Sequence, residues 1–138
     1  MSAENKALVQ ETIEEVFNLK KIRLVNTLYS PWCQGHSPDG SFKNRDACIS
    51  LLQRYITTFP NFRMSTQQII HEDDWVALHY MFVGTNTGSL GIFPASGLTL
   101  TLPGLVVSRV AKNQITDQYF TWDQSKARHQ LQWQTLAA

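Results

Sequence analysis

The periodicity of apolar residues changes near residue 60, and this change constrains the fold more than any other feature of the sequence. Before it, apolar side chains recur at helical spacing over residues 3–19, 21–29 and 44–59. After Pro60 the pattern becomes that of strands, with the clearest alternation and many β-forming side chains in residues 75–87. Helices followed by a run of antiparallel strands predict an α+β fold, with the helices packed on one face of a curved, mostly antiparallel sheet.

Three further strands are predicted at residues 62–71, 98–110 and 115–122, and a short helix at residues 125–136. Pro103 and Gly104 interrupt the third strand in chain order and indicate a bulge or a bend there. Residues 31–40 hold two prolines and two glycines, so we expect an irregular loop between the second and third helices. A strongly bent sheet closed by helices forms a cone, and a pocket with an apolar interior is therefore expected.

Composition narrows the class of protein. The 138 residues fit a single domain, 1–138, and are enough to bury a core. A net charge of +1 without a basic block argues against nucleic-acid binding, and no apolar run approaches the roughly 18 residues that span a membrane. Residues 1–18 are acidic and amphipathic rather than signal-like, and Cys33 with Cys48 makes neither a zinc site nor a disulfide framework. We therefore expect a soluble, cytoplasmic protein.

Several short segments, in order along the chain, carry a family resemblance. They are residues 4–9 (ENKALV), 16–18 (VFN), 28–31 (LYSP, with His36 and Pro38 shortly after it), 59–62 (FPNF), 75–80 (WVALHY), 84–88 (GTNTG) and 91–97 (GIFPASG). Together they resemble the SnoaL-like polyketide cyclase family over residues 4–124. The resemblance implies the cone-shaped α+β barrel of the nuclear-transport-factor-2-like superfamily, which agrees with the periodicity.

The same resemblance implies an activity. Characterised members of the family close rings on polyketide intermediates by an intramolecular aldol-type reaction that uses neither cofactor nor metal. In these proteins a carboxylate on the last strand removes a proton next to a carbonyl, inside an apolar cavity that raises its pKa. In this sequence the matching stretch is Asp117-Gln118-Tyr119-Phe120. Phe120 therefore takes the position of the family's aspartate, and Gln118 takes that of its histidine.

The strand face that carries Phe120 also carries Gln118 and Trp122, because side chains two residues apart point to the same side. If the resemblance holds, these three line the cavity as an apolar floor with one amide, and Gln118 could hydrogen-bond a ligand carbonyl. Ordinary core packing is the alternative. Phe17 and Tyr55 lie on helix faces turned towards the sheet, and they could form another wall, where the Tyr55 hydroxyl would meet a ligand oxygen.

Two histidines are the candidates for proton transfer, since imidazole titrates near neutral pH. His36 lies in the predicted loop, and the resemblance implies a place at the cavity mouth, where Asp39 could orient it. The alternatives are a histidine bonded to the backbone and a plain Asp-Gly turn. His79 lies in mid-strand, and parity alone does not decide between the cavity and a face used for dimerisation. No third ligand follows at motif spacing, so no metal site is expected. Asp123 is expected to cap the last helix rather than to reach the cavity rim.

Three functions follow from these observations. The first is a cofactor-free cyclase or isomerase acting on a small, apolar, carbonyl-containing molecule of polyketide-like chemistry, with His36 or His79 transferring the proton. The alternative is a non-catalytic protein of the same fold that binds a small apolar ligand, which Phe120 at the aspartate position favours. The third is a plain interaction role, in which the outer face of the sheet forms a homodimer by analogy with the superfamily.

Overall fold

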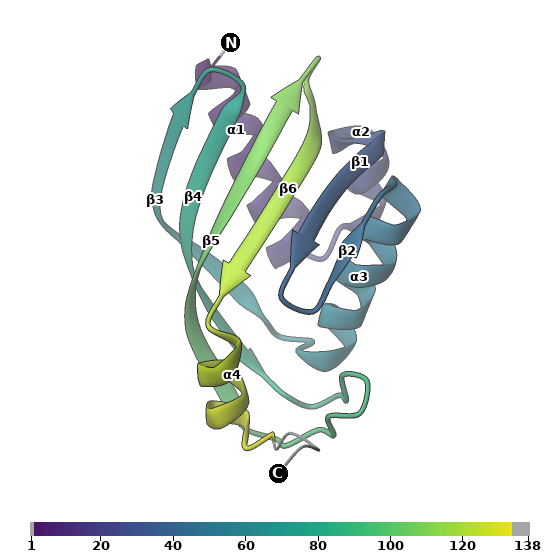
Figure 1. The fold of residues 1–138 in the computed structure, drawn as a ribbon, viewed down its shortest axis with the longest axis vertical. Coiled ribbons are helices and arrows are strands. Elements are labelled where there is room, and N and C mark those ends of the chain that lie inside the picture. Colours follow the sequence, from purple (N-terminus) through teal and green to yellow (C-terminus); the bar gives the residue numbers. More distant parts are fainter. Residues whose placement is uncertain (1, 134–138) are drawn as a thin grey trace.

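In the computed structural model, which describes residues 2–133, six strands form one curved sheet in the order β2-β1-β6-β5-β4-β3. Figure 1 shows α1 and α3 on one face of this sheet and α4 beyond the end of β6. Strand β1 runs parallel to β6, and the other neighbouring strands of this sheet are antiparallel. The predicted α+β class is confirmed.

The elements in chain order are α1 (Ser2–Glu11), η1 (Thr12–Asn18), η2 (Ile22–Leu24), α2 (Val25–Leu28), β1 (Tyr29–Ser37), β2 (Gly40–Phe42), α3 (Arg45–Thr58), β3 (Arg63–Glu72), β4 (Trp75–Thr85), β5 (Thr99–Ala111), β6 (Gln114–Trp122) and α4 (Gln124–Leu131).

A π-helical turn anchors the N-terminal helix on the sheet. Helix α1 continues into η1, after which the Leu19 N–H donates to the Glu14 carbonyl, five residues back, at 3.0 Å. Asn18 is buried, and its side chain accepts from the Met64 N–H at 2.7 Å and donates to the Met64 carbonyl at 2.9 Å. These two bonds fix the end of the helix to β3, and Phe17, one residue earlier, is buried against the sheet.

Side-chain caps set the starts of the two helices that flank the site. The Oδ1 atom of Asn44 accepts from the Ala47 N–H at 2.8 Å, and that of Asp123 accepts from the Lys126 N–H at 2.9 Å. The expected cap role of Asp123 is confirmed. Helix α4 ends at Leu131, before a left-handed residue, and is shorter than predicted. The part of the prediction beyond residue 133 lies outside the described residues.

The expected irregular loop at residues 31–40 is wrong, because most of this segment is strand. Strand β1 covers its first part, a turn at Pro38 and Asp39 follows, and β2 begins directly after the turn. Pro31 lies where the pairing of β1 with β6 shifts register, so its missing N–H does not interrupt a regular ladder. Pairing with a strand about 80 residues away, which no local pattern reveals, outweighs the proline and glycine content here.

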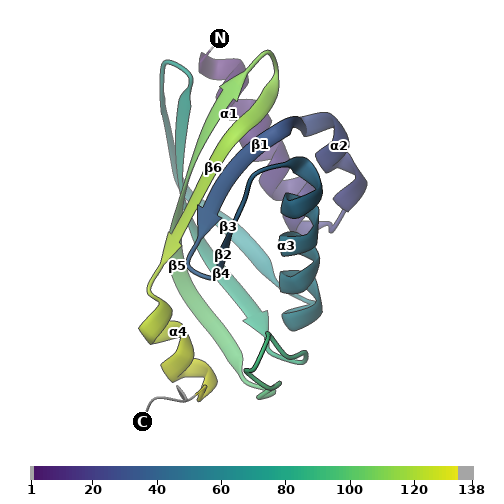
Figure 2. The ribbon, with the colours of Figure 1, turned by 45° about the vertical axis from the view of Figure 1, so that its right-hand side comes forward.

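Strand β5 carries Pro103 and Gly104 without the bulge that was one of the two expectations. Its ladder with β4 has no register shift, and Gly104 pairs with Tyr80. A Cβ atom on Gly104 would lie 2.3 Å from Cζ of the Tyr80 ring, so the absence of a side chain allows the close approach. The alternative expectation, a bend, agrees with the curvature of β4 and β5 in Figure 2.

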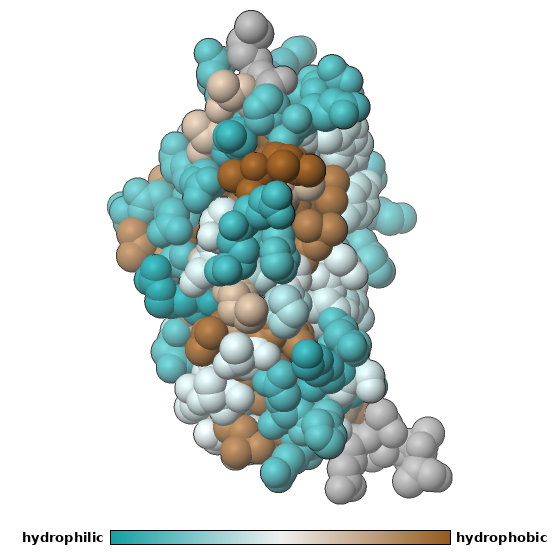
Figure 3. All heavy atoms as spheres, turned by 90° about the vertical axis from the view of Figure 1, so that its left-hand side faces the viewer, coloured by the Kyte–Doolittle hydropathy of each residue, from teal (hydrophilic) through white to brown (hydrophobic). Residues whose placement is uncertain are grey.

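The core lies between the helices and the inner face of the sheet, where the inward side chains of β4 and β5 are buried. Seen from the side of β3, the surface is mostly hydrophilic, with separate hydrophobic groups between the polar side chains (Figure 3). Within residues 2–133, no helix has the length and apolar character needed to cross a membrane.

Candidate functional site

A cavity of about 110 Å³ lies between α3, the inner face of the sheet, α4 and the loop after β4. Its lining is mainly apolar and rich in aromatic side chains, among them Phe17, Tyr55, Tyr80, Phe82, Phe120 and Trp122. The structure thus has an apolar-lined cavity between the helices and the sheet, and its use as a ligand-binding pocket stays a prediction. A lining of this kind holds a ligand by burial of apolar surface, while a few polar groups fix its orientation.

The structure brings the five residues predicted to bind a ligand to this one cavity. Phe17, Tyr55, Gln118, Phe120 and Trp122 all line it. The rings of Phe17 and Phe120 stack with centroids 5.8 Å apart, and Tyr55 meets Trp122 edge to face at 6.0 Å. Their position in the cavity wall is established, and their contact with a ligand stays a prediction.

Gln118 is buried, and both ends of its amide already have partners. Its Oε1 accepts from the Tyr29 hydroxyl, and its Nε2 donates to the Ser108 Oγ at 3.1 Å. Burial, together with the nearby thiols of Cys48 and Cys33, raises the pKa of Tyr29 well above its usual value, so its hydroxyl remains a donor. The Nε2 atom has a second N–H, but Gln118 is only 1% exposed, so it acts first as a structural group of the cavity floor.

Both candidate histidines lie outside the cavity. His36 is exposed on β1 with its Nδ1 2.8 Å from the Ser41 Oγ, and His79 is exposed on β4. The expectation of His36 at the cavity mouth is wrong because its segment is a strand, in which the flanking residues Gly35 and Ser37 are buried and His36 points outward. The alternation of β4 likewise directs His79 to the outer face. Neither imidazole can reach a molecule held in the cavity.

Instead, a carboxylate enters the cavity wall from the turn between β1 and β2. Asp39 accepts from the Tyr55 hydroxyl at Oδ2, at 2.9 Å, and from Nε2 of Gln124 at Oδ1, at 2.7 Å. The Ser37 Oγ lies 3.0 Å from the Tyr55 hydroxyl, and Nε1 of Trp122 donates to Gln124 at 2.9 Å. We call Ser37, Asp39, Tyr55, Trp122 and Gln124 the Asp39 cluster. All five line the cavity.

The tyrosine of this cluster remains protonated. Burial is the main cause that raises the pKa of Tyr55 far above its ordinary value, and the negative charge of Asp39 adds to it. Tyr55 is therefore a permanent hydrogen-bond donor beside a carboxylate. Sequence reasoning noted Asp39 only as a turn residue or a partner of His36, because a segment taken for an irregular loop gave no direction for its side chain.

Arg128 on α4 is a second polar group of the cavity that sequence reasoning missed. Its guanidinium carbon lies 4.9 Å from the centre of the Phe93 ring, which itself stacks on Trp133 at 4.9 Å. The Nε atom of Arg128 is buried and has no hydrogen-bond partner among the described residues. Nothing in the helical pattern of residues 125–136 placed one of its cations against the pocket.

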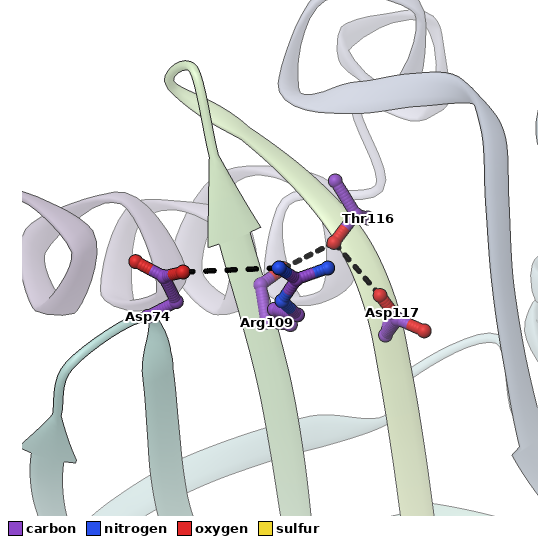
Figure 4. Close-up of polar contacts among 4 residues, drawn as sticks. All are labelled: Asp74, Arg109, Thr116 and Asp117. Atoms are coloured by element: carbon purple, nitrogen blue, oxygen red, sulfur yellow. Dashed lines mark hydrogen bonds and ion pairs between the residues drawn. The ribbon is translucent and has the colours of Figure 1, made fainter.

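Asp117, the carboxylate of β6, lies on the outer face of the sheet, in agreement with its strand parity. Asp117 accepts from Thr116 at 2.8 Å, and the nearby Arg109 lies 3.8 Å from Asp74 (Figure 4). Asp117 also accepts from Gln34 at 2.9 Å. Burial alone would raise the pKa of Asp117, but these hydrogen bonds, a third from a tyrosine and the Arg109 charge together lower it. Asp117 is thus a charged structural group away from the cavity.

In the part of the chain that the structure describes, no group of three or more His, Cys, Asp or Glu side chains could hold a metal ion.

The outer face of the sheet exposes large hydrophobic side chains, among them Trp32, Val83, Leu105 and Tyr119. The homodimer expected through this face stays a prediction.

Comparisons with known proteins agree with this architecture. The family model for SnoaL-like polyketide cyclases matches residues 7–131. The chain belongs to the SnoaL-like polyketide cyclase family. No functionally curated sequence matches this family member. Among solved structures, it is similar to a candidate SnoaL-like polyketide cyclase from Jannaschia sp. CCS1, with 14% identity, a TM-score of 0.89 and coverage of 97% of this chain and 95% of the other.

Two further structures show how widely the same fold occurs. IdmH, a candidate polyketide cyclase from Streptomyces antibioticus, is 21% identical with a TM-score of 0.80, and the match covers 93% of this chain and 98% of that one. An epoxide hydrolase of the LEH-like type from M. tuberculosis is 12% identical with a TM-score of 0.76, covering 95% and 91%. At these identities the likeness supports the cone-shaped α+β fold, and the chemistry must be argued from this chain's own cavity.

Proposed function

We propose that this SnoaL-like protein is a cofactor-free cyclase or isomerase that transfers a proton at a carbon next to a carbonyl, on a small, apolar, polyketide-like molecule. The observation that carries the proposal is the carboxylate of Asp39 in the wall of an otherwise apolar cavity, within 2.9 Å of the Tyr55 hydroxyl. A carboxylate and a neutral phenol side by side supply the two groups that enolisation requires, a base for carbon and a donor for oxygen.

Each group has one role in this proposal. Asp39 takes the proton from the carbon next to the carbonyl, and the electron pair of the broken C–H bond moves into the enolate. The single proton of the Tyr55 hydroxyl bonds Asp39 in the free protein. Once Asp39 has taken up the proton from carbon, this hydroxyl turns and donates to the enolate oxygen, with Ser37 3.0 Å away. In a ring closure the enolate carbon forms a C–C bond with a second carbonyl carbon of the same molecule, the π electrons of that carbonyl move to its oxygen, and Asp39 returns the proton to this new alkoxide. In an isomerisation Asp39 returns the proton to another carbon of the enolate system. Gln124 holds the carboxylate in position through its bond to Oδ1.

The test is hydrogen–deuterium exchange at C2 of 1-tetralone in D₂O, followed by NMR, because this small apolar ketone needs only the proposed proton transfer. We expect the wild-type protein to accelerate exchange, and Asp39→Asn to lower the rate by about 10²–10⁴-fold. Asp74→Asn is the matched control, since Asp74 is exposed and its ion pair with Arg109 is loose at 3.8 Å. An unchanged rate in Asp39→Asn, with the fold intact by circular dichroism, would contradict the assignment.

Binding without turnover is the second candidate, and one observation favours it. If Phe120 stands where other family members carry their catalytic aspartate, its stacking on Phe17 at 5.8 Å fills that position with apolar surface. Trp122 and Trp133 both line the cavity, so quenching of tryptophan fluorescence by 1-tetralone reports binding directly. Saturable quenching without any exchange above background would support the binding protein over the enzyme.

A further inference from the structure

We propose that Arg128 binds an acidic group of the ligand, so that the molecule recognised is an apolar keto acid rather than a neutral ketone. This inference rests on the proposed function for the place of the reacting carbonyl. It starts from a cation in an apolar wall: Arg128 lines the cavity beside Phe93 and Trp133 and has no ion pair with a described acidic residue.

The missing partner of the guanidinium is the main argument. The Nε atom of Arg128 is buried and forms no hydrogen bond within residues 2–133. A buried donor without an acceptor is costly, and most such groups in folded proteins have a partner in the protein, a water molecule or a ligand. The face of the Phe93 ring stabilises the charge of the guanidinium, but it accepts no hydrogen bond from the N–H groups in the guanidinium plane.

Asp39, the carboxylate of the cavity wall, is not that partner in this structure. It forms no ion pair with Arg128, and its two oxygens accept from Tyr55 and Gln124 instead. A guanidinium is a planar fork of donors that matches the two oxygens of a carboxylate. The cavity therefore has an anionic pole at Asp39 with partners in the protein, and a cationic pole at Arg128 whose buried Nε has no partner among residues 2–133.

The spacing of the two poles limits the ligand. Gln124, which holds Asp39, and Arg128 are four residues apart on α4, so their side chains lie on the same face of the helix, one turn apart. Four residues correspond to a rise of roughly 6 Å. The ligand that fits both poles carries its carboxylate about that distance from the carbonyl at the Asp39 cluster, with its apolar part against the aromatic wall.

The test compares 4-benzoylbutyrate, whose carboxylate and ketone have this separation, with the neutral 4-benzoylbutyramide. Affinities are measured by isothermal titration calorimetry for the wild-type protein, Arg128→Met, Arg128→Lys and the control Lys126→Met, which removes an exposed cation from the same helix. We expect the wild-type protein and Lys126→Met to prefer the acid by about 10- to 100-fold, Arg128→Met to lose that preference while still binding the amide, and Arg128→Lys to fall between them.

Equal affinity of the wild-type protein for acid and amide, or no measurable binding of the acid, would overturn the proposal. A preference that survives in Arg128→Met would do the same. The wild-type comparison needs no variant, so it stands even if Arg128→Met does not fold. Binding requires no proton transfer, and 1-tetralone carries no acid. A failure of the exchange experiment and a failure of this one are therefore distinguishable.

Discussion

Replacing Tyr29 by phenylalanine tests whether the cavity floor depends on a buried hydrogen-bond chain. Tyr29 and Ser108 are each 0% exposed and Gln118 is 1% exposed, so water cannot replace a lost partner. The substitution removes one oxygen and leaves Oε1 of Gln118 without its donor. An unsatisfied buried acceptor costs about 1–3 kcal/mol of unfolding free energy. For a domain of this length that corresponds to a fall in Tm of roughly 3–10 °C.

The assay is urea unfolding followed by circular dichroism, with Tyr119→Phe as the matched control. Tyr119 lies on the same strand as Gln118 but is 39% exposed, and its hydroxyl bonds Asp117 at 3.2 Å on the outer face. We expect this control to change stability by less than about 0.5 kcal/mol. The cost of Tyr29→Phe should also be constant from acid to mildly alkaline pH, because the pKa of Tyr29 lies well above its ordinary value. Equal losses in the two variants would refute the argument.

Two further substitutions test the parts of the fold that support the site. Burial and the charge of Arg63 lower the pKa of Lys20 from 10.5 to about 8, so the folded chain holds fewer protons than the unfolded one between these values. Stability relative to Lys20→Met should therefore rise as pH increases from 8 to 10.5, and a difference in urea midpoints that is flat or falling would contradict this. Gly104→Ala places a Cβ atom 2.3 Å from the Tyr80 ring, and the forced movement should cost about 1–3 kcal/mol. A cost under about 0.5 kcal/mol in urea unfolding would show that the ring moves freely.

The regular parts of the fold follow from local patterns in the sequence. The predicted helix at residues 44–59 and the strand at residues 75–87 agree closely with α3 and β4, because each has the full period of its structure and a clear stop signal. Asp123 was identified as a cap from its position alone. Strand β1 was missed because its stability comes from a parallel partner on β6, and no local pattern reports a pairing of such long range.

In the candidate site, too, the sequence predicted the features that depend on local pattern and missed those that depend on long-range packing. Strand parity and helix faces grouped five aromatic and amide positions, and the family resemblance indicated that the Phe120 face lines the cavity. All five residues line it. The predictions for His36 and Asp39 failed for one reason. The direction of each side chain depends on whether residues 31–40 form an irregular loop, as predicted, or a strand followed by a tight turn, as observed. Arg128 could not be placed, because the contact of α4 with the loop after β4 is set by packing rather than by periodicity.

The position of the carboxylate bears on how function is inferred in this fold. Side chains from the turn after β1, from α3, from β6 and from α4 meet in one wall of the cavity, so a group from any of these elements can reach the same ligand. In this chain β6 contributes Phe120, which stacks on Phe17, while the charge comes from Asp39 and is held by donors from α3 and α4. A hydrophobic side chain on the last strand and a carboxylate from the turn after β1 therefore line the same cavity. For such a cone, the whole lining must be searched for ionisable groups, because no single strand decides which of them face the ligand.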